Sequence, residues 1–559
     1  MGDTVTGMDR SSDAALPPEP GIASGAAPAT PAATSSGIAR AAGINSIGNV
    51  ASRILGLVRE AVVAGTFGAS GATSVFDAVS QVPKMVYELL VGGMLSAALV
   101  PVLSEYATQE RQKELERILS ILLSLTALVM LVVTVLLELT APWVARVLLG
   151  GFDPTLQDTA TLLVRVIVPS IFVYGLSGIL QAYHYARKEF AYPAMGAPVH
   201  NLGTILAVVL LAGKLDITSL SVGILMAATF QFLMQLPGLR GTRLSLCFDW
   251  RHPVVRRILH LYAPVVLSII IQNVGIVIDR NLASRTVAEA ITWMSKATFL
   301  IQLPLGLVSM AISLAVLPTL SQIDARAELD RFKGTLSMGL RLVLVVIIPA
   351  AVGLLVLGKP IIQLIFEHGA FTPADTQQSW YALRLYLIGL PFTAIDLPLV
   401  FAFYAQKDTV TPVMVGIAAV VIYLIVGPAL AFLLGWGFLG LVIANSLQWT
   451  SHALIMLFVF GRRFEGLRGY NVGRTTIKAT AASLAVALFG YATYLGMRAL
   501  PLGDGFLQRA LIVCVSGGMG ILGYLLGARL LHITEVDQLW GVIRRRLIRP
   551  PASAEERAK

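Results

Sequence analysis

Two stretches of sequence decide the fold: Y-A-R-K-E-F-A-Y-P, from Tyr185 to Pro193, and Y-A-Q-K-D-T-V-T-P, from Tyr404 to Pro412. We call the step in numbering from Tyr185 to Tyr404 the repeat offset. The same offset brings four earlier residues, Gly150, Phe152, Pro154 and Arg165, onto Gly369, Phe371, Pro373 and Arg384. A chance match in one loop would not extend in this way, so the chain contains an internal repeat.

The repeat extends towards the start of each unit. L-V-P-V-L-S, from Leu99 to Ser104, matches V-L-P-T-L-S, from Val316 to Ser321, and Pro83 in Q-V-P corresponds to Pro304 in Q-L-P. The steps in numbering between these pairs differ slightly from the repeat offset, as short insertions would produce. Two related units therefore follow one another along most of the chain.

The composition indicates that lipid surrounds both units. Of 559 residues, 56% are hydrophobic and 13% charged, with a mean hydropathy of +0.76, whereas soluble domains contain about 25% charged residues. Apolar segments long enough to span a bilayer, roughly 20 residues each, recur along the chain and predict an all-α integral membrane protein with about fourteen spans. We place these spans near residues 43–66, 73–103, 116–138, 160–185, 191–213, 217–239, 258–279, 288–320, 337–357, 378–404, 411–434, 437–460, 477–498 and 507–531.

Each repeat unit holds six spans, so both units insert in the same orientation and a pseudo-two-fold axis along the membrane normal relates them. The predicted organisation is a disordered cytoplasmic tail (1–36), an N-terminal six-helix lobe (37–250), a C-terminal six-helix lobe (251–464), two additional helices (465–535) and a basic cytoplasmic tail (536–559). This is a transporter architecture. Rocking of one lobe against the other would expose a central cavity to each side in turn.

Loop charges predict the orientation. One alternate set of loops carries roughly nineteen Lys and Arg residues and the other about seven, which places both termini in the cytoplasm by the positive-inside rule. The net charge of +10 is explained by these loops and does not indicate nucleic-acid binding. Basic residues beyond the last span, Arg544, Arg545, Arg546 and Arg549, suit contact with anionic lipids of the cytoplasmic leaflet.

Ionisable residues inside spans are costly in lipid and are therefore candidates for the site. Arg53 and Arg59, six residues or about 9 Å apart on the first span, would contact one large anion at two depths. Alternatively, Arg59 pairs internally with Glu60 or Asp77, and Arg53 extends to the cytoplasmic interface.

Two lysines extend the predicted site. Lys84 in the second span and Lys296 in the eighth lie in repeat-related regions and would make the cavity wall basic, as phosphate binding requires. Lys84 also has an alternative partner, Glu88, four residues away on the same helix. The pair Asp279 and Arg280 is interpreted as interfacial, and the charges in repeat-related spans, Arg165, Arg384 and Asp396, as braces between helices.

No pattern indicates an enzyme. We find no zincin, nucleophile-elbow or nucleotide-binding motif, and His184, His200, His260 and His368 lack ligand spacing. Cys247 and Cys514 are too far apart to indicate a metal site or a disulfide framework. The sequence predicts no cofactor. A bound Na⁺ or Cl⁻ could not be recognised from a sequence motif.

Several motifs, in this order, resemble the MurJ (MviN) lipid II flippases of the multidrug/oligosaccharidyl-lipid/polysaccharide exporter superfamily. They are S-R-I-L-G-L-V-R-E (Ser52–Glu60), F-G-A (Phe67–Ala69), G-G-M-L-S-A-A-L-V-P (Gly92–Pro101), D-R-N-L-A-S (Asp279–Ser284), L-P-L-G (Leu303–Gly306), F-E-H-G-A-F-T (Phe366–Thr372) and F-Y-A-Q-K-D-T-V-T-P (Phe403–Pro412). The resemblance covers nearly the whole membrane region.

The resemblance implies two six-helix lobes around a cationic cavity, with the last two helices forming a groove for a polyprenyl tail. It implies a flippase in the bacterial cytoplasmic membrane that moves lipid II to the outer leaflet, and it assigns Arg53 and Arg59 to the pyrophosphate or sugar head group. Cell-wall synthesis proteins are possible partners.

This chain departs from the family pattern at three positions. The family often has an acidic residue at Ser74, and arginines near Tyr87 and at Phe299. Lys84 and Lys296, each about one helical turn away, are our candidates for restoring the positive charge. The departures leave open an exporter of another polyprenyl-linked glycan or of a small molecule, and a scaffold without transport activity.

Overall fold

The computed structural model describes residues 31–501, 503, 505–538 and 541. Most of the two predicted tails, 1–30 and nearly all of 536–559, lies outside these residues. The first helix, α1, spans Pro31–Phe67, so the predicted disordered tail ends too late, because residues 31–36 already belong to this helix. The described residues form helices and no strand.

The first repeat unit contains the helices α1 to α10. After α1 come α2 (Gly71–Val79), α3 (Gln81–Tyr87), α4 (Val100–Tyr106), α5 (Gln112–Leu139), α6 (Ala141–Leu149), α7 (Pro154–Ile167), α8 (Pro169–Ala186), α9 (Ala191–Leu215) and α10 (Thr218–Gln235). Two π-helical segments, Glu88–Gly92 and Leu95–Leu99, join α3 to α4, so that α2 to α4 form one interrupted span. The short helix α6 was not expected from the sequence.

The second unit contains α11 (Pro253–Ser284), α12 (Ala290–Pro304), α13 (Met310–Ser321), α14 (Leu329–Ile365), α15 (Pro373–Ala405), α16 (Val410–Pro428) and α17 (Gly437–Arg463). A π-helical segment, Leu305–Ser309, interrupts its second span as in the first unit. Helices α18 (Val472–Ala499) and α19 (Phe506–Leu530) complete the described chain and pack on α14. The fold is thus two six-span lobes with two further helices.

The repeat is visible in the backbone. The repeat offset carries the first residues of α7, α9 and α10 onto the first residues of α15, α16 and α17. It also carries Lys188 onto Lys407, and both adopt positive φ, at 61° and 60°. Their amides donate to Tyr185 and Tyr404 at 3.0 and 2.9 Å. The two matching sequences therefore end their helices in the same way, which confirms the repeat.

Eleven helical runs in the described part of the chain are long and apolar enough to cross a membrane. The remaining predicted spans correspond to α1, the interrupted run from α2 to α4, and α11, which are helical but fall outside that set. Helix α1 carries Arg53, Arg59 and Glu60, charges that lower the apolar character of this span. Together, the runs agree with the prediction of about fourteen spans.

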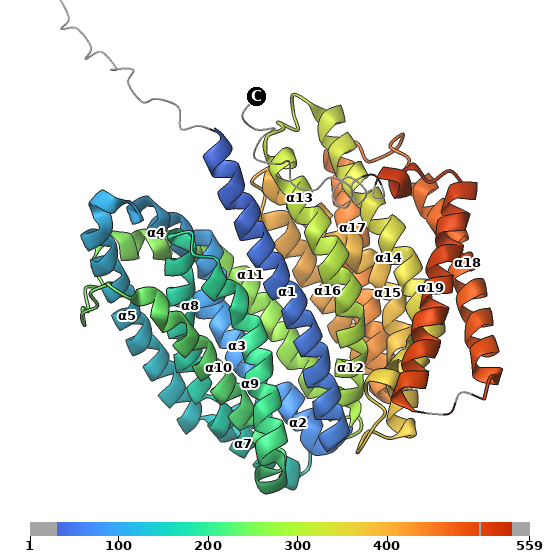
Figure 1. Cartoon of the computed structure of the whole chain (residues 1–559), viewed down its shortest axis with the longest axis horizontal. Helices are drawn as coiled ribbons and strands as arrows, with labels where there is room; N and C mark the ends of the chain where they lie inside the picture. Colours follow the sequence, from blue (N-terminus) through green and yellow to red (C-terminus); the bar gives the residue numbers. More distant parts are fainter. Residues whose placement is uncertain (1–30, 502, 504, 539–540, 542–559) are drawn as a thin grey trace, which may run out of the picture.

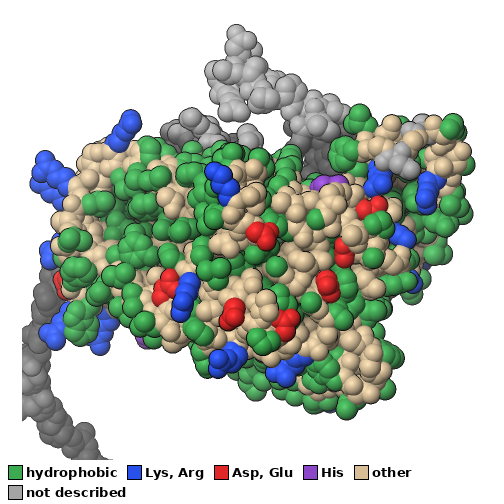
Figure 2. Space-filling model, turned by 90° about the horizontal axis from the view of Figure 1, so that it is seen from below, with side chains coloured by type: hydrophobic (Ala, Val, Ile, Leu, Met, Phe, Trp, Pro, Cys, Tyr) green, Lys and Arg blue, Asp and Glu red, His purple; other side chains and the backbone are tan. Residues whose placement is uncertain are grey.

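The lobes stand side by side, with α1 between them (Figure 1). Helix α1 begins on the face where α19 ends, which we call the terminal face; α1 ends and α19 begins on the other, the opposite face. Figure 2 shows the opposite face, where acidic and basic side chains are interspersed among polar and apolar ones. Because α1 begins and α19 ends on the same face, the arrangement agrees with an even number of spans.

Helix α11 belongs to both lobes. At the terminal face, Arg257 makes two hydrogen bonds of 2.7 Å with Glu105 of α4. Near the opposite face, Asn281 donates to the carbonyl of Val147 in α6 at 2.8 Å. The predicted lobe boundary at residue 251 therefore divides the sequence repeat, whereas α11 itself packs along the N-terminal lobe.

Candidate functional site

Three charged side chains from both lobes meet beside α1. Glu60 pairs with Arg59 at 2.7 Å and with Lys296 of α12 at 2.7 Å. Arg59 also donates to Asn201 of α9 at 3.0 Å. The cluster therefore connects α1 and α9 of the first lobe to α12 of the second.

The cluster changes the interpretation of Lys296. Its side chain is 1% exposed. In this arrangement the ammonium group is paired with Glu60 and does not face solvent. Arg59 is 28% exposed and remains accessible despite its pair. The internal pairing of Arg59 with Glu60, one of the two alternatives drawn from the sequence, is thus formed, and it leaves part of the guanidinium free.

Asp77 extends the cluster towards α11. It interacts electrostatically with Lys296 and with Arg280 of α11. Its Oδ2 is buried without a hydrogen-bond partner. Asp77 therefore contributes negative charge between the lobes, and its geometry suits a brace for two cations better than direct contact with an anionic substrate.

Arg53 lies on another side of α1 from this cluster. The guanidinium of Arg53 lies against Gly306, in the π-helical segment of the second lobe. A Cβ added to this glycine would be 2.9 Å from the guanidinium. Arg53 is partly exposed and has no hydrogen-bond partner among the described residues. It is thus a cation available to a ligand at the boundary of the two lobes.

Lys84 is exposed, and no ion pair joins it to Glu88, although the structure describes both residues. The intrahelical pair considered from the sequence is therefore not formed. Lys84 remains available for a ligand, so its assignment to the site stays a prediction.

The three positions that depart from the family pattern are all in contact with neighbours. The Ser74 and Thr292 hydroxyls are 3.0 Å apart and join the two lobes. The ring of Tyr87 lies 6.0 Å from that of Tyr174. Phe299 packs edge to face with Phe366 at 6.4 Å. A hydrogen bond and aromatic packing thus occupy places where the pattern has charges.

The loop after α14 covers the end of α1 at the opposite face. The amide of Ala370 donates to the carbonyl of Gly65 at 2.8 Å, and His368 Nε2 lies 2.9 Å from the carbonyl of Ala61. A Cβ at Gly68, which has φ +63°, would lie 2.4 Å from the carbonyl oxygen of Ala370. Small residues are required here because the two backbones are nearly in contact.

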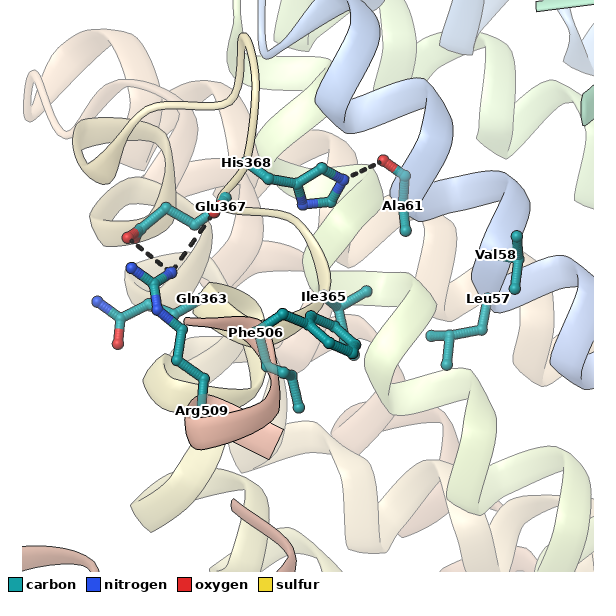
Figure 3. Close-up of a pocket in the computed structure, with 10 residues that line it drawn as sticks. Leu57, Val58, Ala61, Gln363, Ile365, Glu367, His368, Phe506 and Arg509 are labelled. Atoms are coloured by element: carbon teal, nitrogen blue, oxygen red, sulfur yellow. Dashed lines mark hydrogen bonds and ion pairs between the residues drawn. The ribbon is translucent and has the colours of Figure 1, made fainter. Parts of the chain in front are cut away.

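An apolar groove of about 600 Å³ lies between α1 and the ends of α14 and α19 (Figure 3). Leu57 and Val58 of α1 line one side and Phe506 of α19 the other. Arg509, which approaches Glu367 at 3.4 Å, marks the polar end of the groove. Helix α1 thus presents apolar residues to this groove and charged residues, on other faces, to the lobes.

Comparison with known proteins identifies the family. The sequence model described as "Lipid II flippase MurJ" matches residues 63–510. A probable lipid II flippase MurJ of Vibrio cholerae is 30% identical over 86% of this chain and 94% of its own length. The lipid II flippase MurJ of Burkholderia cenocepacia is 28% identical over 85% of this chain and 95% of its own.

The chain belongs to the MurJ family.

A solved structure agrees with this assignment. The "Lipid II flippase MurJ, inward closed conformation" superposes with a TM-score of 0.71, at 25% identity, over 90% of this chain and 99% of that one. An inward-facing transporter of the multidrug MATE family has a TM-score of 0.64 at 12% identity, over 75% of this chain and 95% of that chain, which shows a shared fold. The sequence-based assignment to the MurJ family is confirmed.

Sequence reasoning gave little weight to a second polar site that this MurJ-family chain holds in its C-terminal lobe. Asp279 accepts hydrogen bonds from Tyr423 at 2.6 Å and from Asn445 at 2.9 Å. Asp396 lies 2.7 Å from His452. These residues line a cavity within the lobe, so the interpretation of Asp279 as interfacial needs correction. Asp396 joins α15 to α17 through His452, as expected of a brace, and it also faces the cavity.

The repeat contained a signal that finds this site. By the repeat offset, Asp396 corresponds to Ser177, and His452 corresponds to Leu233. Charged groups thus stand in one unit where the other has uncharged side chains. Arg384 lies 4.7 Å from the Trp380 ring in its own helix, so its expected role as a brace between helices stays a prediction. Among the described residues, no cluster of His, Cys, Asp and Glu has the form of a metal site.

Proposed function

We propose that this chain is a flippase that moves the polyprenyl-linked peptidoglycan precursor lipid II from the cytoplasmic to the outer leaflet of the bacterial inner membrane. Its membership of the MurJ family across residues 63–510 carries this proposal. The mechanism is transport by alternating access of the two lobes, without covalent chemistry. Both termini face the cytoplasm, as the loop charges predict.

The head group binds to the exposed cations of α1 and its surroundings. Arg53 has no partner among the described residues, and Arg59 is only partly satisfied by Glu60 and Asn201. Guanidinium groups in a low-dielectric site bind pyrophosphate strongly because they donate paired, charge-assisted hydrogen bonds. Lys84 adds a third accessible charge. Lys296, which is buried, contributes by holding Glu60 in place.

The polyprenyl tail lies in the groove between α1 and α19. This groove is mostly apolar and borders the helix that carries both arginines. A single helix thus serves an amphipathic substrate, with the head group at its basic side chains and the tail at Leu57 and Val58. The assignment follows the requirement that a lipid tail remains in apolar surroundings while its head group crosses the membrane.

Complementation tests this function. A bacterium depleted of its own lipid II flippase would express the wild-type chain, Arg53→Ala, Arg59→Ala or the control Lys214→Ala, whose exposed lysine lies at the end of α9. We expect growth with the wild type and the control, and lysis with both arginine variants at equal membrane levels. Lysis with a well-inserted wild type would contradict the assignment of lipid II and favour another polyprenyl-linked glycan.

A further inference from the structure

The cavity in the C-terminal lobe has a volume of about 670 Å³ and lies between α11, α15, α16 and α17. Its ionisable lining comes from each of these helices: Asp279 and Arg280 from α11, Asp396 and Tyr404 from α15, Tyr423 from α16, and His452 from α17. Ionisable side chains at membrane depth are costly and rare, so those that occur usually mark functional sites, proton relays among them. The cavity is therefore a candidate site that the binding of lipid II does not require.

The geometry of the His452–Asp396 pair suits the binding of a proton. Nδ1 of His452 lies 2.7 Å from Oδ1 of Asp396. The other ring nitrogen, Nε2, faces Gly416, where a Cβ would lie 3.8 Å away. It has no hydrogen-bond partner among the described residues. The two side chains are 18% and 23% exposed and line the cavity, so the ring is accessible to a proton from the cavity.

The charge balance of the cavity favours one added positive charge. Asp279 and Asp396 are negative and Arg280 is positive, so the lining carries one net negative charge when His452 is neutral. Asp279 accepts hydrogen bonds from the uncharged Tyr423 and Asn445, whereas the hydrogen-bond partner of Asp396 is the ionisable His452. A proton on His452 makes the cavity neutral, and imidazole changes charge between about pH 5 and 8.

The cavity is connected to the boundary of the lobes through Arg280. This residue lines the cavity and also interacts electrostatically with Asp77 of α2 in the other lobe. When His452 is neutral, the cavity lining carries a net negative charge, which holds Arg280 at the cavity and weakens its interaction with Asp77. When His452 is protonated, the cavity lining is neutral and Arg280 interacts more strongly with Asp77. The charge of the pair thus acts on an electrostatic interaction between the lobes.

We propose that His452 and Asp396 form a proton-binding site, and that loss of its proton favours separation of the lobes at the opposite face. The equivalent residues of the N-terminal lobe, Ser177 and Leu233, cannot bind a proton in this way. The proton-binding site is therefore confined to the C-terminal lobe. Proton binding does not depend on the identity of the transported lipid.

The reporter is Ser74→Cys, in a background where Cys247 and Cys514 are serine. Ser74 is fully buried against Thr292 of the other lobe, so a maleimide reaches this cysteine only when the lobes separate. The full chain would be labelled in liposomes without lipid II, at a series of pH values. Each rate is divided by the rate for the same denatured protein at that pH, which removes the effect of thiol ionisation.

We expect the normalised rate to rise about fivefold or more from pH 5.5 to pH 8. His452→Gln and Asp396→Asn should each give a flat profile. The control His260→Gln, which alters an exposed histidine of α11 outside the cavity, should keep the rise. A flat profile without these substitutions, or a rise that survives both of them, would overturn the proposal.

A sodium series at fixed pH separates a proton from a metal cation. Dependence on sodium with no dependence on pH would overturn the assignment of a proton. Histidine-selective ¹⁵N labelling of the full chain in a bilayer gives a second measurement if the glutamine variant folds poorly. The signal of His452 should report gain of a proton as the pH is lowered, and Asp396→Asn should alter this response; an imidazole that stays neutral throughout would contradict the proposal.

Discussion

The two lobes share one backbone plan and differ in where they place charge. Lys188 and Lys407 occupy matching left-handed positions, yet Ser177 and Leu233 of the first lobe correspond to Asp396 and His452 of the second. In the first lobe, Ser177 is buried and accepts a hydrogen bond from Gln235. In the second, the charged pair lines a cavity. The two units thus share a backbone, and substitutions at equivalent positions give the second lobe charged groups where the first has uncharged ones.

The ion pairs that join the lobes differ just as clearly. Glu60 and Lys296 are 18% and 1% exposed, whereas Glu105 and Arg257 are 46% and 51% exposed. A buried charge that loses its partner is costly, whereas an exposed one is solvated by water. The first pair should therefore govern stability, and the second should contribute little.

The largest effect is expected from Glu60→Gln. This change leaves Lys296 buried without its hydrogen-bonded carboxylate and should reduce the free energy of unfolding by about 3 kcal/mol or more. Thermal unfolding in detergent measures the loss. The double variant Glu60→Gln/Lys296→Met should recover much of the stability, and Glu105→Gln serves as the exposed control. Equal losses in Glu60→Gln and Glu105→Gln would contradict this distinction.

Gly68→Ala should have the next largest effect. The residue has φ +63°, and the added Cβ would lie 2.4 Å from the Ala370 carbonyl, so the loop must move away from α1. Left-handed backbone alone costs a non-glycine residue about 1 to 2 kcal/mol. We expect faster labelling of Ser74→Cys at the opposite face. Gly241→Ala has φ +83° with open space around it; if it accelerated labelling equally, the contact with Ala370 would not be the cause.

Asp396→Ser/His452→Leu converts the pair of the second lobe into the residues of the first. Removing both members leaves no unpaired charge, so stability should change by only about 1 kcal/mol. Growth in the complementation assay should become less sensitive to external pH while Arg59 remains essential. Loss of Arg59 dependence in this variant would show that the two sites are not separate.

The smallest effect concerns Asp408, which corresponds to Glu189 in the repeat. Burial acts to raise the pKa of Asp408, but hydrogen bonds from Thr411 and Arg463 prevail and hold this pKa below its usual value. The resulting stability is present above the unfolded pKa of about 3.9 and is lost as the pH falls through the folded value. Asp408→Asn should therefore lower the melting temperature slightly at pH 6 and by less at pH 3. An equal difference at both pH values would rule out this carboxylate as the cause.

Local sequence patterns predicted the helices and the repeat, because apolar runs of sufficient length and turn residues act over short distances. The pairing of Glu60 with Lys296 joins residues 236 positions apart, and no local pattern specifies it. The short helix α6 lies in a connection that hydropathy alone treats as a loop. The Asp396–His452 pair depends on how α15 and α17 pack, although comparison of the repeats marks both positions as unusual.

The most direct measurement of the central claim is the appearance of lipid II in the outer leaflet. Cells depleted of their own flippase would express the wild type or Arg59→Ala, and a membrane-impermeant enzyme that cleaves exposed lipid II would report its amount. The account predicts cleavable lipid II with the wild type and near-background levels with Arg59→Ala at equal expression. Equal cleavage in the two strains would contradict the role of the α1 arginines, and none in either would contradict lipid II transport itself.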